Sequence, residues 1–159
     1  MHIPITLETL MGRRSDMNKI IVGVDGSEAS LEALRRAKDL ARTLNAQVEV
    51  IGCWDYPRMY DGYMISGIEG FKESADKVLN DAVKRVFGSD APSNLKVSLL
   101  RGDPRALLTK ASENADLLVV GRRGHGSFTG MLIGSVSSSC IAHAKCPVLV
   151  AHAPEENGN

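Results

Sequence analysis

Several features that mark nucleic-acid-binding, membrane and secreted proteins are missing from this sequence of 159 residues. Lys and Arg total 19, as do Asp and Glu, so the formal net charge is zero, and no long basic run offers a footprint for a polyanion. The longest apolar runs have the length of strands, far below the roughly 20 residues that a membrane-spanning helix needs. The first residues lack the long apolar core of a secretion signal. We therefore expect a cytoplasmic protein that binds neither nucleic acid nor membrane.

Cysteine is scarce as well, with only Cys53, Cys140 and Cys146. An odd number of cysteines without an export signal fits reduced thiols, so we expect no structural disulfide. The spacing Cys140-x2-His143-x2-Cys146 superficially resembles a metal cluster, but it lacks the four-ligand pattern of structural zinc. We expect Cys140 to lie on the packing face of a helix, and we expect no metal site.

The chain length fits one domain with an extension at its start. Residues 1–17 show no sustained period and are predicted to form a flexible N-terminal extension. Residues 18–153 are predicted to form the domain, and residues 154–159 a short tail. The long connection over residues 55–70 carries several aromatic residues, which suits either a lid or an ordinary surface loop.

Within the domain, apolar runs alternate with amphipathic stretches. Helix starts are marked by Ser27, a good N-cap, and by Asp103 followed by Pro104 at a first helical position. The alternation of strand and helix predicts an α/β fold with a doubly wound, five-stranded parallel sheet and helices on both faces. We expect the strand order 3-2-1-4-5. The predicted strands cover residues 20–24, 47–54, 95–100, 116–120 and 147–152, and the helices cover 31–44, 71–86, 104–114 and 135–144.

In such a fold, ligands bind beyond the carboxyl ends of the strands, where the winding reverses. The predicted order puts Asp25, after the first strand, opposite Gly121, after the fourth. Asp25 can accept hydrogen bonds from ribose hydroxyls or an adenine amino group, or it can simply form a turn with Gly26. The residue pattern leaves both interpretations open.

Residues 121–135 read GRRGHGSFTGMLIGS and follow an apolar strand. Glycines allow backbone N–H groups to turn toward an anion, and a serine at a helix start adds further donors and the positive end of the helix dipole. Arg122, Arg123 and His125 add positive character, so we favour a phosphate site over a plain surface loop. Ser127 stands where a Walker loop needs lysine, so the segment is not a P-loop. The glycines follow the fourth strand rather than the first, which excludes the dinucleotide fingerprint.

The spacing Gly121-x2-Gly124-x9-Gly134-Ser135 resembles the signature of the ATP-binding type of the universal stress protein (UspA-like) family. Residues 22–27, reading VGVDGS, also resemble the first strand of that family, and the resemblance extends over residues 19–152. It implies an adenine nucleotide alpha-hydrolase-like fold and a cytoplasmic, ATP-binding homodimer. Mg²⁺ would accompany ATP, held mainly by the phosphates and water.

The resemblance also implies a set of nucleotide-binding residues. Those on the base side would contact adenine and ribose, the glycine-rich segment would surround the ribose and the first phosphate, and the last helix would meet the β- and γ-phosphates. The residues on the base side are Val24, Asp25, Cys53 and Val120. Those of the glycine-rich segment are Gly121, Arg123 and Gly124, and those at the start of the last helix are Gly134, Ser135, Val136 and Ser137.

The predicted strand over residues 147–152 would form an apolar sheet edge, which a soluble protein normally covers. We expect a second copy to cover it, and the family resemblance implies the same homodimer. We find no nucleophile elbow, no zinc-protease motif and no Ser/His or Cys/His pair, so we assign no catalytic residue.

Three functions stay open at this point. The first is a nucleotide-dependent regulatory protein of the stress response, in which ATP changes the choice of a protein partner. The second is slow ATP hydrolysis or autophosphorylation at a serine of the last helix, among Ser135, Ser137, Ser138 and Ser139. The third is a nucleotide-free interaction scaffold.

Overall fold

The computed structural model describes residues 18–57, 70–89, 91–123 and 133–155. The predicted N-terminal extension, most of the connection over residues 55–70 and the end of the tail lie outside these ranges. Gly124 and His125 lie outside them as well.

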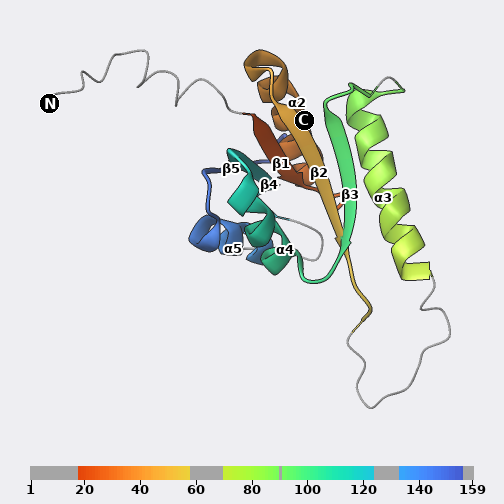
Figure 1. The fold of residues 1–159 in the computed structure, drawn as a ribbon. Coiled ribbons are helices and arrows are strands. Elements are labelled where there is room, and N and C mark those ends of the chain that lie inside the picture. The colour runs from red at the N-terminus through yellow and green to blue at the C-terminus, as the bar shows by residue number, and fades with distance from the viewer. Residues whose placement is uncertain (1–17, 58–69, 90, 124–132, 156–159) are drawn as a thin grey trace, which may run out of the picture.

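Five strands form one parallel sheet in the order β3-β2-β1-β4-β5, which confirms the predicted topology. The order reverses between β1 and β4, so the first and fourth strands are neighbours at the centre of the sheet (Figure 1). β3 and β5 are the two edge strands. The strands are β1 Lys19–Gly23, β2 Gln47–Trp54, β3 Leu95–Arg101, β4 Leu117–Gly121 and β5 Val148–Ala151.

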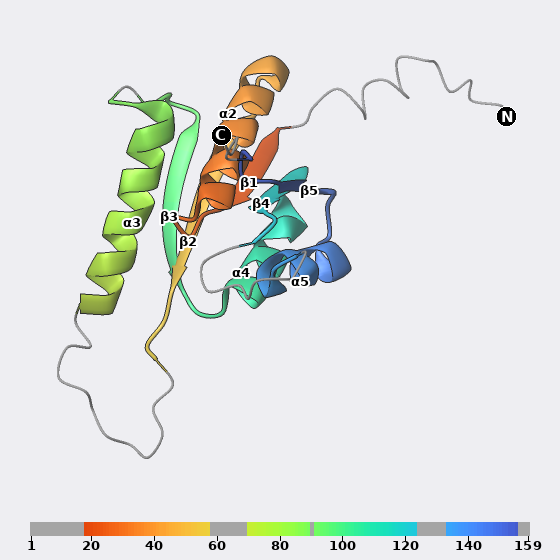
Figure 2. The ribbon, with the colours of Figure 1, turned by 180° about the vertical axis from the view of Figure 1, so that it is seen from behind.

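Helices cover both faces of the sheet, as Figures 1 and 2 show from opposite sides. Helices α2 (Glu28–Leu44) and α3 (Gly70–Phe87) pack on one face, and α4 (Pro104–Ala111) and α5 (Ser135–His143) pack on the other. The strands are apolar along most of their length because residues on both faces are covered. Each layer of helices encloses its own apolar cluster, with Ile20, Val22 and Leu34 in the first and Ile21, Leu118 and Cys140 in the second.

Helix α2 packs on the sheet through small side chains. Ala29, Ala33, Ala37 and Ala41 recur every fourth residue and are all buried. A repeat of four residues keeps these positions on one side of a helix, where alanine permits a close approach to the strands. The close approach of α2 to β4 decides which residue can stand at the end of that strand.

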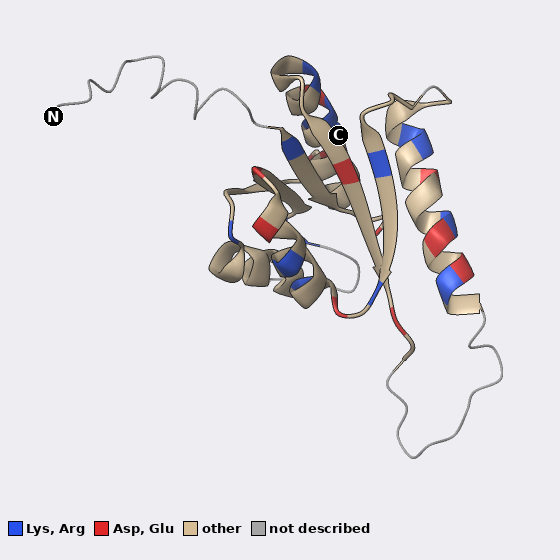
Figure 3. Ribbon diagram, in the orientation of Figure 1, with Lys and Arg blue, Asp and Glu red and all other residues tan. Residues whose placement is uncertain are grey.

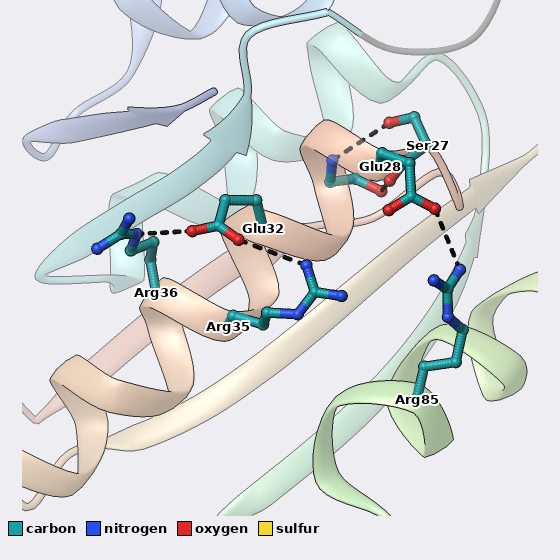
Figure 4. A network of polar contacts seen from close by, with 7 residues as sticks. Ser27, Glu28, Glu32, Arg35, Arg36 and Arg85 are labelled. Carbon is teal, nitrogen blue, oxygen red and sulfur yellow. Dashed lines mark hydrogen bonds and ion pairs between the residues drawn. The ribbon is translucent and has the colours of Figure 1, made fainter. Parts of the chain in front are cut away.

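The opposite side of α2 carries a network of charged residues (Figure 4). Glu32 contacts Arg35 at 3.4 Å and Arg36 at 2.9 Å, and Glu28 contacts Arg85 of α3 at 3.3 Å. Exposed ion pairs of this kind contribute about 0–1 kcal/mol each. The two ion pairs of Glu32 lie within α2, so of these three contacts only that between Glu28 and Arg85 links α2 to α3.

The helix predicted over residues 104–114 differs in its last turn. The α-helix ends at Ala111, and the chain continues as a 3-10 helix, η1 (Ser112–Asn114). The hydroxyl of Ser112 donates to the carbonyl of Thr109 at 2.6 Å and accepts from the backbone N–H of Lys145 at 2.9 Å. A serine that bonds its own preceding turn competes with regular helix geometry, which explains the tighter turn.

Candidate functional site

The candidate site lies where the sheet order reverses, at the carboxyl ends of β1 and β4. Val22 of β1 is in register with Val119 of β4, so the residues that follow these strands emerge at the same edge. Asp25 follows β1 and Gly121 is the last residue of β4. The structure therefore brings Asp25 and Gly121 to one edge, as the sequence predicted.

Asp25 belongs to a turn that starts α2. One carboxylate oxygen, Oδ1, accepts from the backbone N–H of Ser27 at 2.9 Å and from its hydroxyl at 2.5 Å. Gly26 between them has a φ of 85°, in the left-handed region that favours glycine. Ser27 in turn accepts from the N–H of Ser30 at 3.2 Å and caps the helix as predicted. The turn interpretation of Asp25 is thus seen directly, and its contact with a ribose stays a prediction.

The start of α5 is built differently. Gly134 is its N-cap residue and has no side chain to cap the helix, and the first turn contains no acidic residue. The backbone N–H of Gly134 donates to the carbonyl of Arg122 at 2.7 Å, which fixes the helix start against the end of β4. Ser135 is exposed and Val136 is half-buried. The first N–H groups of a helix have no partner within the helix, so those of Ser135 and Val136 are suited to an anion.

Ser137 connects the first turn of α5 to the end of β4 through its side chain. Its hydroxyl is buried and donates to the carbonyl of Gly121, with the carbonyl of Arg122 at 3.3 Å. Among the serines that the sequence suggested as phosphate acceptors, Ser137 therefore has its hydroxyl committed to backbone carbonyls. Ser135 and Ser138 are exposed.

The N-terminus of α5 differs from those of α2 and α4 in how it is capped. Ser27 caps α2, and Asp103 caps α4 by accepting from the N–H of Arg105 at 2.9 Å. The N-cap residue of α5 makes no side-chain cap, and Figure 3 shows no Lys, Arg, Asp or Glu on α5. The positive end of its dipole is not offset by a nearby carboxylate of its own first turn. Of these three starts, α5 is the best suited to a phosphate group.

The residues predicted to contact the base lie on two sides of the sheet. Cys53 and Val120 pack into the cluster under α4 and α5, and Val120 is buried there. Burial, followed by the nearby Asp103 and Cys140, raises the pKa of the Cys53 thiol to about 11, so this thiol is uncharged near neutral pH. That fits an apolar wall. The side chain of Val24 lies in the cluster under α2 and α3, on the other face, so only its main chain can meet a ligand beside Cys53.

A cavity of about 620 Å³ opens between the start of α2 and the residues that follow β4 and β5. Of the predicted nucleotide residues, Arg123 lines it. The contributions of the stretch after β5 and of the start of α2 were not predicted from the sequence. The lining residues are Ser27, Glu28, Ala29, Arg122, Arg123, His152, Ala153, Pro154 and Glu155.

Arg122 and His152 meet in this cavity, with Nη1 of Arg122 3.2 Å from Nδ1 of His152. From the sequence, Arg122 was expected only to add positive charge near the phosphate site, and His152 was not predicted to belong to the site. Their contact could have been predicted from the strand register. Gly121 of β4 is in register with Ala151 of β5, and Arg122 and His152 are the residues that follow them.

The sequence also led to predictions about the cysteines, a metal site and a membrane-spanning helix, and the described residues, 18–57, 70–89, 91–123 and 133–155, bear on each. Cys140 lies on the buried side of α5, as predicted, and all three cysteines are free thiols. Across those ranges no group of three His, Cys, Asp or Glu side chains is arranged to hold a metal ion. Nor does any helix there combine the length and the apolar character that a membrane crossing requires.

The sequence is similar to those of universal stress proteins. A putative universal stress protein of Staphylococcus aureus (strain USA300) is 32% identical over 142 residues, which cover 86% of this chain and 84% of that protein. A universal stress protein of Mycobacterium tuberculosis (strain ATCC 25618 / H37Rv) is 32% identical over 146 residues. This match covers 83% of the chain, and the chain spans 44% of the length of the mycobacterial protein.

Solved structures show the same fold. A universal stress protein in complex with cAMP is 27% identical, with a TM-score of 0.64 over 87% of this chain and 98% of that chain. The universal stress protein from Archaeoglobus fulgidus in complex with dAMP is 23% identical, with a TM-score of 0.60 over 84% and 97% of the two chains. At that identity the likeness concerns the fold. The model of the Universal stress protein family matches residues 17–152, which include all five strands and the start of α5. The chain therefore belongs to the universal stress protein family.

Proposed function

We propose that this chain binds an adenine nucleotide, ATP with Mg²⁺, at the carboxyl ends of β1 and β4. The observation that carries the proposal is the start of α5, which has no side-chain cap and no acidic residue, whereas Ser27 and Asp103 cap α2 and α4. A related protein of 27% identity was solved with cAMP, which supports an adenine nucleotide as the ligand.

In this proposal the phosphates lie on the N–H groups of Ser135, Val136 and Ser137. Gly134 begins the helix, and its own N–H donates to the carbonyl of Arg122 at 2.7 Å. Because the Ser137 hydroxyl donates to the carbonyl of Gly121, Ser137 contributes through its main chain. The Ser135 hydroxyl is exposed and adds a donor. Mg²⁺ is held by phosphate oxygens and water, since that ion keeps several waters and few protein ligands.

The base and ribose occupy the neighbouring strand ends. Cys53 and Val120 offer apolar surface on the α5 side of the sheet, and Asp25 accepts from the ribose. Gly121 lets β4 end close to α2, and Arg123 contacts the ribose and the first phosphate. Gly124, predicted from the sequence to make the same contacts, lies outside the described residues. Val24 contributes main-chain atoms, because its side chain packs under α2.

We further propose that the protein acts as a homodimer in the cytoplasm and that bound ATP alters its choice of a protein partner. The support is the exposed apolar edge of β5, where Leu149 is 37% exposed, together with a site that has no assigned catalytic base. A second copy that pairs with β5 would cover this edge.

A single added carboxylate tests the phosphate site. Ser135→Asp places a negative charge where the phosphates would lie, and we expect calorimetric titration with ATP and Mg²⁺ to show affinity at least about tenfold lower. The same carboxylate favours a helix N-terminus, so thermal unfolding should show equal or slightly higher stability. Loss of binding without loss of stability separates the site from a folding defect.

Ser138→Asp is the matched control. Ser138 is exposed on the same helix, and its N–H already bonds to the carbonyl of Gly134 at 2.9 Å. We expect this variant to bind ATP far better than Ser135→Asp. Wild-type affinity in the Ser135→Asp variant would show that the start of α5 holds no phosphate.

A further inference from the structure

Ser137 differs from the other serines of α5 in being buried. It is the third residue of the helix and is 3% exposed, whereas Ser135 and Ser138 are exposed and Ser139 is half-buried. A buried hydroxyl needs a hydrogen-bond partner inside the protein, and this one donates to the carbonyl of Gly121 at the end of β4. Because its proton is already used there, the hydroxyl does not donate to a phosphate. Its effect on a ligand must pass through the backbone.

Two consecutive carbonyls at the end of β4 receive the start of α5. The carbonyl of Arg122 accepts from the N–H of Gly134 at 2.7 Å. The carbonyl of Gly121 accepts from the hydroxyl of Ser137, which also lies 3.3 Å from the carbonyl of Arg122. The two donors are three residues apart, less than one turn of the helix. A single contact would let α5 tilt about Gly134, whereas two contacts within one turn fix both the position and the tilt of the helix start.

The end of β4 is a rigid reference for these contacts. A Cβ added to Gly121 would lie 2.7 Å from the carbonyl carbon of Ala29 in the first turn of α2, so the two backbones are in direct contact. That turn is capped by Ser27, whose N–H and hydroxyl both donate to the carboxylate of Asp25. Ser137 thus joins the N–H groups proposed for the phosphates to the part of the fold that carries Asp25.

We propose that Ser137 is a positioning residue that gives the nucleotide site a preference for ATP over AMP. The N–H groups of Ser135 and Val136 have no partner within the helix, and a hydrogen bond to a phosphate oxygen weakens steeply when its angle is poor. The Ser137 hydroxyl holds these donors in line with the β- and γ-phosphates, which the family resemblance assigns to the start of α5. AMP has neither phosphate, so its binding does not depend on this alignment. The inference rests on the proposed nucleotide site.

Ser137→Ala removes the hydroxyl, and Ser112→Ala is the matched control. Ser112 is 1% exposed, and its hydroxyl donates to the carbonyl of Thr109 at 2.6 Å and accepts from the N–H of Lys145, just beyond the other end of α5, at 2.9 Å. Both changes remove a buried hydrogen bond, so both should lower the midpoint of thermal unfolding. Calorimetric titration with ATP and Mg²⁺, well below both midpoints, should show affinity about tenfold lower in Ser137→Ala and within about twofold of the wild type in Ser112→Ala.

AMP separates a loss of alignment from a general defect of the site. In Ser137→Ala the affinity for AMP should stay within about twofold of the wild type, so the ratio of ATP affinity to AMP affinity falls. Ser137→Thr keeps a hydroxyl at this position and should bind ATP more tightly than Ser137→Ala. Should the added methyl group of threonine unfold the protein, the comparison of Ser137→Ala with Ser112→Ala still decides.

Three results would overturn the inference. They are unchanged ATP affinity in Ser137→Ala, equal losses of ATP and AMP affinity in that variant, and an equal loss of ATP affinity in Ser112→Ala.

Amide hydrogen exchange tests the alignment without nucleotide. The N–H of Gly134 donates to the carbonyl of Arg122, and in the ligand-free protein it should exchange about tenfold faster in Ser137→Ala than in the wild type or in Ser112→Ala. Unchanged exchange in Ser137→Ala would overturn the positioning role. If the wild type binds no ATP, the proposed function fails and the preference fails with it, whereas the exchange of Gly134 still decides whether Ser137 positions α5.

Discussion

Gly121 packs against the first turn of α2 more closely than a side chain permits. A Cβ at this position would lie 2.7 Å from the carbonyl carbon of Ala29 and 2.8 Å from the nitrogen of Ser30, which are backbone atoms that cannot swing aside. The glycine is therefore required by packing, whatever its role toward a phosphate. A mutation at Gly121 that abolishes nucleotide binding would not by itself identify the binding site.

This predicts a loss of stability for Gly121→Ala of about 1–3 kcal/mol, because the added methyl group overpacks a rigid contact. Urea denaturation should show the lower midpoint with an unchanged slope. The matched control is Gly70→Ala at the start of α3, where an added Cβ meets nothing within 4 Å. Equal stability in the two variants would mean that α2 moves aside freely.

Single residues differ in how far the sequence alone could assign them. The caps Ser27 and Asp103 were predictable, since each is a local pattern of a few consecutive residues. The hydrogen bond from Ser137 to Gly121 was not, because it joins a helix to a strand end and depends on their final packing. For the same reason the glycine pattern indicated a phosphate site without revealing that Gly121 also packs on α2.

At the level of elements, the two faces of β5 are unequal. Val148 and Val150 are half-buried and pack into the cluster under α4 and α5. Leu149 between them points to the other face and is 37% exposed. A charge at Val150 would therefore disturb the core of one subunit, whereas a charge at Leu149 reports on the exposed edge.

If the proposed homodimer pairs through β5, we expect Leu149→Glu to give a monomer in sedimentation velocity, because two carboxylates would meet across the paired edges. Ile141→Glu is the control, since Ile141 is an exposed apolar residue of α5 (54% exposed) rather than of the edge strand, and this variant should leave the proposed dimer intact. A dimer that survives Leu149→Glu with unchanged sedimentation would place the interface elsewhere.

Element types and their order followed from the sequence, because the apolar runs and the helix periods are strong and the caps punctuate them. The second predicted strand matches β2 at both ends. The strand predicted over residues 116–120 begins and ends one residue later, at Leu117 and Gly121, and the last strand is shorter at both ends. These limits depend on where a neighbouring strand stops offering hydrogen bonds, which no local pattern records. The same holds for the 3-10 turn at Ser112, whose hydroxyl pairs with distant Lys145.

Across the whole molecule, one buried carboxylate ties three strands together. Glu49 of β2 contacts Lys19 of β1 at 2.6 Å, and Lys96 and Ser98 of β3 at 3.3 Å and 2.9 Å. Burial alone would raise the pKa of this carboxyl, but the hydrogen bonds from Lys19 and Ser98 and the charge of Lys19 outweigh it, so the pKa is lowered from 4.5. The native state thus favours the ionised form more than the unfolded chain does.

The sign of the pH effect follows from that direction. Stability from Glu49 is present above pH 4.5 and is lost as the pH falls through the lower, folded pKa. At pH 7 we expect Glu49→Gln to be less stable by about 1–2 kcal/mol. Chemical denaturation from pH 7 to pH 3 should show this difference shrinking. A constant difference would indicate that Glu49 acts through packing alone.

The strand order also has a consequence for how the protein is made. β1 lies between β2 and β4, so this strand, which is made before the other four strands of the sheet, can pair with β2 early and waits for residues 117–121 before its other edge is closed. Until then the nascent chain exposes an unpaired edge rich in isoleucine and valine, a surface prone to mispairing. The late segment that closes this edge is followed directly by α5 and β5. The sheet and the proposed nucleotide site are therefore completed by the same last part of this domain.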